Sequence, residues 1–321
     1  MLKPHWIAGM IMAGVLVIGA KIAFGQEFPN RPVRFVAGGT GNATDFAARL
    51  IAQGLTGNWG QQVIVDNRPN GVFAGDMVAK SAPDGYTLML GGTLLWVGHL
   101  LQDNEPYHPV RDFAPVTLVA ISPSVLVIHP SVPAKSAKEL IALAKARPGQ
   151  LNYGSGGTGS ATHLGAELFK SMAGINMVRI PYKSNSQLMT DLIAGQIQVT
   201  FSPSAGVEPF ISSGRLRSLA VTGARRAAAF ADLPTLAEAG LPGYEALLQV
   251  GVFAPAKTPA MLINRLNQET VRVLTKPDIR EKLLNAGMEA VGSSPEQFAG
   301  IIKTDIGRWS KVIKDAGIRA D

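Results

Sequence analysis

Short runs of β-branched residues alternate with amphipathic stretches along most of this chain, and this alternation restricts the fold more than any other feature. In a first series the pattern predicts strands at 33–36, 62–65 and 86–90, with helices at 44–55 and 73–80 between them. This order is typical of a parallel sheet that is covered by helices. The N-terminal part of the chain is therefore expected to be of the α/β class.

A second series of the same kind follows a proline-containing connection. It predicts strands at 116–120, 125–128, 151–153, 177–180, 197–201 and 216–221, and helices at 136–146, 161–172, 187–194 and 207–212. The last third adds a strand at 248–253 and helices at 259–274, 277–286 and 295–316, each of which has a proline near its start. Two series indicate two lobes, a discontinuous first lobe of residues 26–120 plus about 225–321 and a second lobe of about 121–224. A ligand cleft between them is expected.

The first 25 residues have the pattern of a secretory signal peptide. Lys3 precedes an apolar run at 6–20, and the small residues Ala23 and Gly25 stand three positions and one position before the expected cleavage site. The run is shorter than the roughly 20 residues that a membrane-spanning helix needs, and a retained N-terminal anchor is the alternative. Because the chain has no Cys, lipid attachment after this run is excluded. We expect cleavage near Gly25 and export to the periplasm.

The distribution of charge argues against a nucleic-acid partner. There are 30 Lys and Arg residues against 23 Asp and Glu residues, but the surplus is scattered, and its densest cluster is Arg225–Arg226. The sequence contains no stripe of basic residues interleaved with aromatic ones. A mildly positive surface instead suits a small anionic ligand.

Residues 38–45 form a glycine-rich loop between the first predicted strand and the first predicted helix. Glycine leaves backbone N–H groups uncovered, and the N-terminus of the following helix adds unpaired donors and the positive end of its dipole. An anion bound at this loop is expected to contact Gly41, Asn42, Thr44 and Asp45. The alternative is that Thr44 or Asp45 caps the helix, with Arg49 as an ion-pair partner one turn later.

A second loop, at residues 154–163, also joins a strand to a helix. Its four glycines and its hydroxyl side chains make it rich in donors, and the candidate ligand-binding residues are Ser155, Gly156, Gly157, Thr158, Gly159, Ser160, Thr162 and His163. Gly154, Gly156 and Gly159 have the spacing of a dinucleotide fingerprint. That fingerprint also needs an acidic residue after the next strand, and 177–183 contains none. No nucleotide cofactor is therefore expected.

Catalysis is the competing class of function. Ser160 and His163 are a potential nucleophile and base, but neither Ser155 nor Ser160 lies in a G-x-S-x-G pattern. The other histidines of the exported chain lack metal-ligand spacing; they are His99, His108 and His129. The absence of Cys excludes thiolate metal sites and cysteine nucleophiles. We expect no metal, no cofactor and no enzymatic activity.

Three shorter segments follow predicted strands at 91–93, 181–186 and 202–206. Ligands of parallel sheets collect outside the carboxyl ends of the strands, so Thr93, Tyr182 and Ser202 are further candidates for ligand contact. For Tyr182 and Lys183 the alternative is packing and solvation at the lobe surface.

Several short motifs occur in a characteristic order. The most specific stretch contains Tyr153–Ser160, His163–Leu164, Glu167–Phe169, Pro181–Lys183, Asp191–Leu192 and Gly195–Gln196, and supporting motifs lie at 66–69, 82–88, 219–223 and 233–240. With these motifs the chain resembles the Bug, or tripartite tricarboxylate transporter, family of periplasmic receptors. The resemblance extends from residue 28 to the last predicted helix.

This resemblance implies an α/β, two-lobed fold of the type II periplasmic-binding-protein class, often called a Venus flytrap. It also implies an extracytoplasmic solute-binding function in which the two glycine loops clamp a carboxylate, here Gly38–Asp45 and Ser155–His163. The implied partners are a small mono- or dicarboxylate and the membrane subunits of a tripartite transporter. A membrane sensor kinase is the alternative partner.

The sequence departs from the family pattern at two positions that bear on the ligand. Asn42 stands where the family has Gly, in a loop that also lacks the usual Pro, and Ser184 replaces the Gly that follows Tyr-Lys. The identity of the carboxylate therefore does not follow from the resemblance. We expect the far end of the ligand to contact Phe35, Asn42, Thr93, Ser202 and Ser204.

Overall fold

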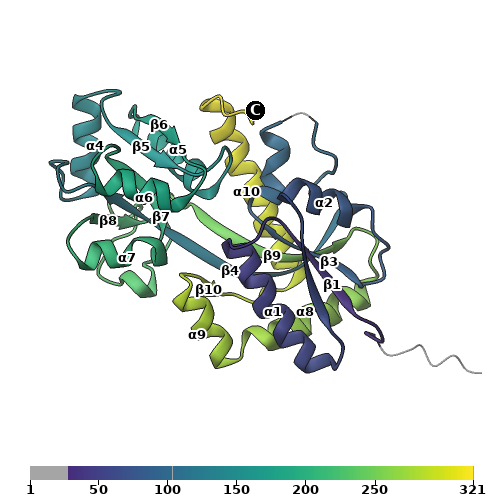
Figure 1. Cartoon of the computed structure of the whole chain (residues 1–321). Coiled ribbons are helices and arrows are strands. Elements are labelled where there is room, and N and C mark those ends of the chain that lie inside the picture. Colours follow the sequence, from purple (N-terminus) through teal and green to yellow (C-terminus); the bar gives the residue numbers. More distant parts are fainter. Residues whose placement is uncertain (1–27, 103, 321) are drawn as a thin grey trace, which may run out of the picture.

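Two lobes lie side by side in the computed structural model, which describes residues 28–102 and 104–320 (Figure 1). The expected signal peptide, residues 1–25, lies outside the described residues. The sheet has the strand order β2-β1-β3-β9-β4-β7-β5-β6, so it passes from one lobe into the other.

Lobe 1 is built on the parallel strands β1 (Val33–Ala37), β2 (Val63–Asn67) and β3 (Thr87–Gly92), which confirms the parallel pairing expected for the first series. Its helices are α1 (Ala43–Trp59), α2 (Gly71–Ala79), α8 (Ala260–Leu274), α9 (Pro277–Asn285) and α10 (Pro295–Asp315). Alternate residues of β1 face opposite sides. Val33 and Phe35 share a core with α1 and α8, whereas Val36 packs in the core that contains α2 and α10.

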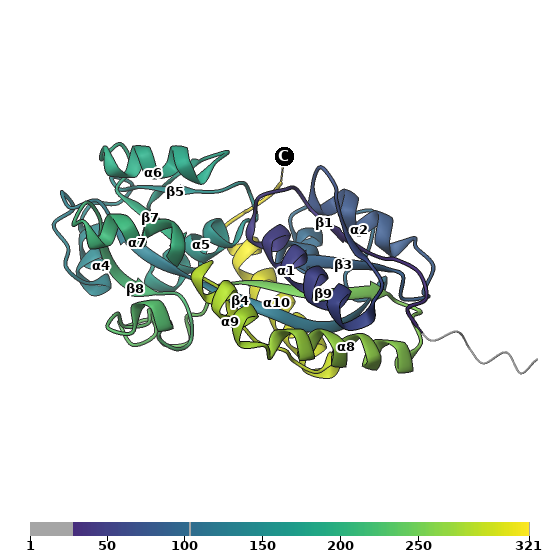
Figure 2. The same ribbon diagram turned by 60° about the horizontal axis from the view of Figure 1, so that its bottom comes forward.

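The strands β4 (Phe113–Ile128) and β9 (Leu247–Pro255) run side by side between the lobes (Figure 2). β4 pairs with β9 as far as Pro123 and with β7 from Ser124 onward. The prediction of two short strands at 116–120 and 125–128 is therefore wrong, because β4 is continuous. It tolerates Pro115 at a register shift and Pro123 where it changes its partner, which are irregular positions that suit proline in a sheet.

Lobe 2 contains β5 (Asn152–Ser155), β6 (Val178–Pro181), β7 (Val199–Pro203) and β8 (Arg217–Val221). Its helices are α4 (Ala137–Ala146), α5 (Ala161–Ala173), α6 (Asn185–Ile193) and α7 (Ser204–Ser212). β5 is parallel to both β6 and β7. The predicted starts of α6 and α7 at residues 187 and 207 are too late, because α6 begins at Asn185 and α7 at Ser204.

Four short elements were not predicted. They are α3 (Leu94–Val97), the 3-10 turns at Gly98–Leu100 and Ala228–Phe230, and β10 (Glu289–Ala290), which pairs with β4. The segment 222–246 is attached to lobe 2, because Thr222 N–H donates to Ser124 O over 2.9 Å and Tyr244 Oη–H donates to Gly165 O over 2.8 Å. The sequence-based division counted residues from about 225 onward with lobe 1.

The largest apolar core extends through both lobes. It includes Trp96, Phe253 and Phe298 of lobe 1 together with Phe169 and Phe201 of lobe 2. In the part of the chain that the structure describes, no helix combines the length and the apolar character that crossing a bilayer requires.

Candidate functional site

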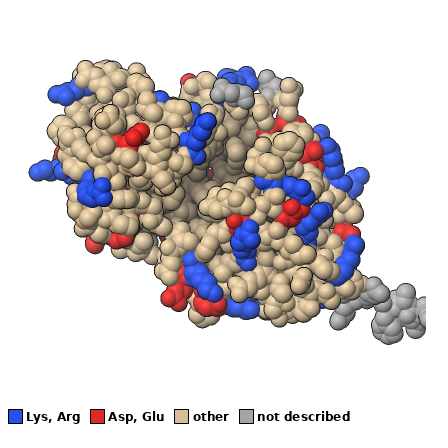
Figure 3. Space-filling view, viewed as in Figure 1, with Lys and Arg blue, Asp and Glu red and all other residues tan. Residues whose placement is uncertain are grey.

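A cavity of about 830 Å³ lies between the two lobes. In the surface view it appears as a hollow whose walls are mostly uncharged (Figure 3). Both glycine loops contribute to its lining, which consists of Thr40, Gly41, Asn42, Ala43, Phe46, Gly156, Gly157, Thr162, Tyr182, Lys183, Ser184, Asn185, Leu188, Phe201, Pro203, Leu248, Ala286 and Met288. The cleft that the sequence predicted between the lobes is therefore present.

Loop 1 (residues 38–45) is held together by its own side chains. Asn42 caps α1 by accepting from Asp45 N–H at 2.9 Å, and its Nδ2 donates to Gly39 O at 3.0 Å. The Asp45 carboxylate accepts from Gly41 N–H at 2.9 Å and forms an ion pair with Arg49. The helix cap is thus Asn42 rather than Thr44 or Asp45, while the expected Asp45–Arg49 pair is present.

Asp45 is buried, and its carboxylate is fully used within lobe 1. Burial alone would raise the pKa of Asp45, but hydrogen bonds from Gly41, Arg49 and Asn67 outweigh burial and lower it. The amide of Ala43 donates no hydrogen bond within the described chain, and this residue lines the cavity. Loop 1 therefore offers the first turn of α1 to a ligand.

Loop 2 (residues 154–163) is also held together by hydrogen bonds to its own side chains. Ser160 caps α5 by accepting from His163 N–H at 3.3 Å, and Thr162 Oγ1 accepts from Gly156 N–H at 3.1 Å. No hydrogen bond from the amides of Gly157 and Thr162 is formed among residues 28–102 and 104–320, and both residues line the cavity. These two amides are available to an anion.

His163 and Ser160 do not form a base–nucleophile pair. The ring Nδ1 of His163 accepts from Gly159 N–H at 3.2 Å, and only the backbone of His163 contacts Ser160 Oγ. Burial, followed by the nearby charge of Arg179, lowers the pKa of His163 to about 4. The imidazole is therefore neutral near pH 7, and it stabilises loop 2 through its hydrogen bond from Gly159.

The N-terminus of α6 is a third contributor, and it lies at Asn185, two residues before the predicted start at residue 187. Ser184 caps α6 by accepting from Gln187 N–H at 3.3 Å, and Asn185 in the first turn lines the cavity. The spacing of Ser184 and Gln187 matches a capping box, so this signal was present in the sequence. Tyr182 also lines the cavity, and its hydroxyl donates to Asp191 Oδ2 at 2.8 Å.

The electrostatic character of the cavity favours an anion. The N-termini of α1, α5 and α6 all reach it, and each adds partial positive charge and unpaired donors. Among its lining residues the charged side chain is Lys183, and no Asp or Glu is present. Phe46, Leu188 and Met288 add apolar surface, which suits a ligand with an anionic head group and a carbon skeleton.

The structure brings some of the predicted site residues into the cavity and keeps others away. Gly41, Asn42, Gly156, Gly157, Thr162 and Tyr182 line it. Thr44, Asp45, Ser155, Thr158, Gly159, Ser160 and His163 belong to the two loops but are not part of the lining. Phe35, Thr93, Ser202 and Ser204, which were expected at the far end of the ligand, are buried outside it.

Two of these four buried residues have clear partners in the protein interior. Phe35 packs in the core of lobe 1, and Thr93 Oγ1 accepts from Gln249 N–H at 3.1 Å. Ser202 Oγ has no hydrogen-bond partner among the described residues. Sequence position after a strand therefore located the right edge of the sheet but not the direction in which each side chain points.

The apolar part of the lining was not predicted. Ala286 and Met288 follow α9 and come from near the C-terminus, and β10 holds this segment against β4 through the pairing of Glu289 with Ile121. No local motif marks these residues, because only the tertiary pairing brings them to the cleft.

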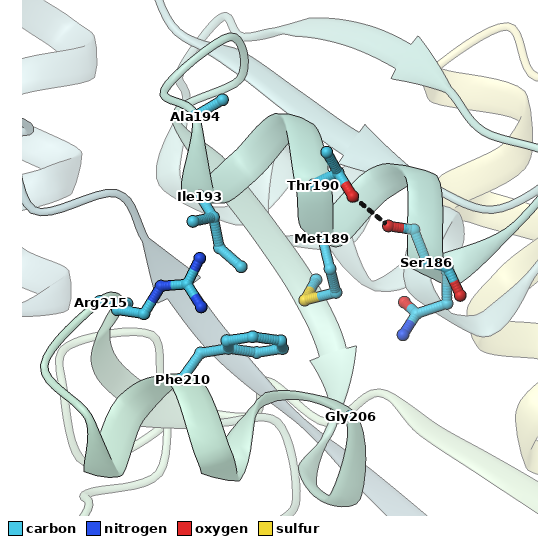
Figure 4. Close-up of a pocket in the computed structure, with 9 residues that line it drawn as sticks. Ser186, Met189, Thr190, Ile193, Ala194, Gly206, Phe210 and Arg215 are labelled. Carbon is cyan, nitrogen blue, oxygen red and sulfur yellow. Dashed lines mark hydrogen bonds between the residues drawn. The ribbon is translucent and has the colours of Figure 1, made fainter.

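A second cavity, of about 610 Å³, lies between α6 and α7 (Figure 4). Met189 and Ile193 face Phe210 across it, and Arg215 lies at one end with its guanidinium 5.4 Å from the Phe210 ring centroid. All of its lining residues come from lobe 2, so the two lobes do not enclose it. In the described part of the chain no group of three or more His, Asp or Glu residues is placed to hold a metal ion.

Comparisons with known proteins agree with this geometry. A family model described as "Tripartite tricarboxylate transporter family receptor" matches residues 47–318. A protein encoded in the tcbD–tcbE intergenic region of Pseudomonas sp. (strain P51) is 36% identical over 300 residues, covering 92% of this chain and 89% of that protein. Protein BugT of Bordetella pertussis is 34% identical over 318 residues, covering 97% of this chain and 98% of BugT.

Solved structures extend the similarity to the fold. Rpa4515 of R. palustris with adipate has a TM-score of 0.79 and 37% identity, covering 92% of this chain and 100% of that chain. MatC of Rhodopseudomonas palustris with bound malate has a TM-score of 0.75 and 28% identity, covering 89% of this chain and 100% of the MatC chain. These matches confirm the predicted two-lobed periplasmic-binding-protein fold. The chain belongs to the tripartite tricarboxylate transporter receptor family, whose members are solute-binding receptors and not enzymes.

Proposed function

We propose that this protein captures a small mono- or dicarboxylate in the cleft between its lobes and delivers it to the membrane subunits of a tripartite tricarboxylate-type transporter. The observation that carries this proposal is the meeting of three helix N-termini at a cavity whose lining has one Lys and no carboxylate. Relatives with 37% and 28% identity hold adipate and malate, which supports a carboxylate as the ligand class.

The ligand carboxylate accepts hydrogen bonds from unpaired amides of both lobes. Ala43 of lobe 1 and Gly157 and Thr162 of lobe 2 line the cavity and have such amides. Hydrogen bonds to a charged acceptor are roughly twice as strong as neutral ones, so each amide favours the ionised form of the ligand. Lys183 attracts the same charge, or a second carboxylate on a diacid.

Closure of the lobes around the ligand completes this set of donors and excludes water. We place the first boundary of lobe 2 near residue 121, shortly before β4 exchanges its pairing with β9 for pairing with β7 after Pro123. The contacts of segment 222–246 favour a return to lobe 1 near Leu247. A contraction of the particle on addition of ligand, measured by small-angle X-ray scattering, tests this closure.

The protein acts in the periplasm in this proposal, after removal of residues 1–25 near Gly25. Family members described as periplasmic binding proteins support that location. N-terminal sequencing of the exported protein is expected to begin at Gln26, and an intact N-terminus on membrane-bound material would indicate a retained anchor instead.

A thermal-shift screen of mono-, di- and tricarboxylates, followed by calorimetry on the hits, tests the binding function. We expect saturable binding of at least one carboxylate, with recovery of the unchanged compound after incubation. Conversion of the compound would indicate an enzyme, and a panel without any hit would contradict carboxylate capture.

Delivery to a transporter is tested separately by uptake of the labelled ligand in cells that lack the receptor. Lost uptake that the wild-type protein restores supports transport. Unchanged uptake together with a lost transcriptional response to the ligand would favour reporting to a sensor kinase.

A further inference from the structure

Arg179 of β6 braces loop 2 from outside the cavity. Its Nε donates to Ser155 Oγ at 2.9 Å, its Nη2 donates to Gly156 O at 2.9 Å, and its Nη1 donates to Thr158 Oγ1 at 3.2 Å. These three acceptors flank Gly157, which lines the cavity and whose amide has no hydrogen-bond partner in the described chain. One guanidinium therefore fixes the loop on both sides of the amide that a ligand would use.

This guanidinium forms no ion pair with a carboxylate in the part of the chain that the structure describes. Within residues 28–102 and 104–320, no Asp or Glu lies within 4.0 Å of the Arg179 nitrogens. Loop 1 differs, because its brace is the Asp45 carboxylate, which pairs with Arg49. A carboxylate that is paired with an arginine thus holds loop 1, whereas a guanidinium without a carboxylate partner holds loop 2.

Arg179 is partly buried and does not line the cavity, so it acts on a ligand through the loop and through space. A charge that is removed from water is screened less than an exposed one. Its field reaches other groups at this loop, since it is one of the causes that lower the pKa of His163.

We propose that Arg179 is the positioning residue that fixes the Gly157 amide toward the cleft and gives loop 2 the positive charge by which it selects anionic over neutral ligands. This inference rests on the proposed function, because it concerns how the same cleft recognises its ligand. It attributes the preference for anionic ligands to a side chain that bonds to loop 2 but does not line the cavity.

The test compares Arg179→Met and Arg179→Lys with a matched control, Arg217→Met. Arg217 also lies in lobe 2 and donates to backbone oxygens, those of Val132 and Ala134, but it does not line the cleft and belongs to a different cavity. Calorimetry with adipate and with its neutral analogue adipamide gives the ratio of the two Kd values for each variant. We expect Arg179→Met to weaken adipate by about tenfold or more and adipamide by less than about twofold.

Arg179→Lys keeps the charge and is expected to retain the preference for adipate, and Arg217→Met is expected to match the wild type with both compounds. An unchanged adipate affinity in Arg179→Met, or an equal weakening of both compounds, would overturn the proposal. Equal losses in Arg179→Met and Arg179→Lys would also overturn it, because the charge would then be irrelevant.

A ligand-free measurement separates this inference from the proposed function. The charged groups that act on His163 are Arg179, Glu167 and Lys170, so NMR titration of the His163 ring reports the Arg179 charge without any ligand. We expect the pKa of His163 to rise in Arg179→Met but not in Arg179→Lys. If the wild type binds neither compound, the recognition of adipate is contradicted. If the pKa of His163 is the same in Arg179→Met and in the wild type, the role of Arg179 is contradicted, whatever the binding result.

Discussion

Gly157→Val is the substitution that separates ligand binding from folding most cleanly. A Cβ built on Gly157 has no heavy atom within 4 Å, and its backbone is not in the left-handed region. Gly156 is less suitable, because a Cβ there lies 3.1 Å from Ser160 Oγ. We therefore expect Gly157→Val to change the free energy of unfolding by no more than about 0.5–1 kcal/mol, and in the stabilising direction if unfolded-state entropy dominates.

The added side chain enters open space beside Gly157, which lines the cavity, so we expect it to compete with a ligand at this amide. Loss of one hydrogen bond to a charged group costs about 1.5–3 kcal/mol, which corresponds to a Kd that is about 10- to 150-fold weaker. Calorimetry with the best carboxylate of the screen measures this loss, and thermal unfolding of the ligand-free variant measures stability. Gly71→Val is the control, because its Cβ also meets nothing within 4 Å and Gly71 does not line the cavity.

A folded Gly157→Val protein with the affinity of the wild type would refute the placement of the ligand at loop 2. A protein that loses both stability and binding would instead show that the space next to Gly157 is filled in solution. Equal losses in Gly157→Val and Gly71→Val would show that the effect is not local to the cleft.

Three further substitutions test the framework of the loops. Gly159→Ala is expected to lower the free energy of unfolding by about 1–3 kcal/mol, because φ is +78° and a Cβ would overlap Leu101; a wild-type Tm would contradict this. Asp45→Asn is expected to cost about 1–3 kcal/mol at pH 7. Because the native pKa of Asp45 is lowered from 3.8, the stability difference between wild type and Asp45→Asn is fully present above pH 3.8 and shrinks as the pH falls below it. Urea unfolding at pH 7 and pH 3 measures this change. His163 has a native pKa of about 4, whereas the ordinary value is 6.5. The free energy of unfolding of the wild type is therefore expected to fall by up to about 3 kcal/mol relative to that of His163→Gln as the pH is lowered from 6.5 to 4. A difference that does not change with pH would argue against a buried neutral imidazole.

Local chemistry made the two glycine loops predictable from the sequence. Each loop lies between a β-branched run and an amphipathic stretch, and each helix begins with a capping side chain, Asn42 or Ser160. Capping and turn formation depend on residues within a few positions of one another, so a single sequence contains the information. The start of α6 was visible in the same way at Ser184 and was missed.

Features that depend on distant pairing were not predictable. The continuity of β4 through Pro115 and Pro123 depends on which strand lies beside it, and propensity alone argues against it. Asp45 and Ser155 illustrate a second limit. Both lie in the expected loops, but whether such a polar side chain faces the ligand or its own loop is decided by partners such as Asn67 and Arg179.

The β4–β9 ladder has a consequence for protein engineering. Pro123 and Leu247 face each other across it, so the chain enters and leaves lobe 2 through neighbouring positions. Opposed residues of antiparallel strands have Cα atoms about 4.5–5.5 Å apart, a gap that a two-residue hairpin turn can join. Residues 124–246 thus form a cassette whose two ends lie side by side. We expect that it can be exchanged for that of a relative without cutting the ladder, provided that the relative supplies the lobe 2 side of the shared apolar core.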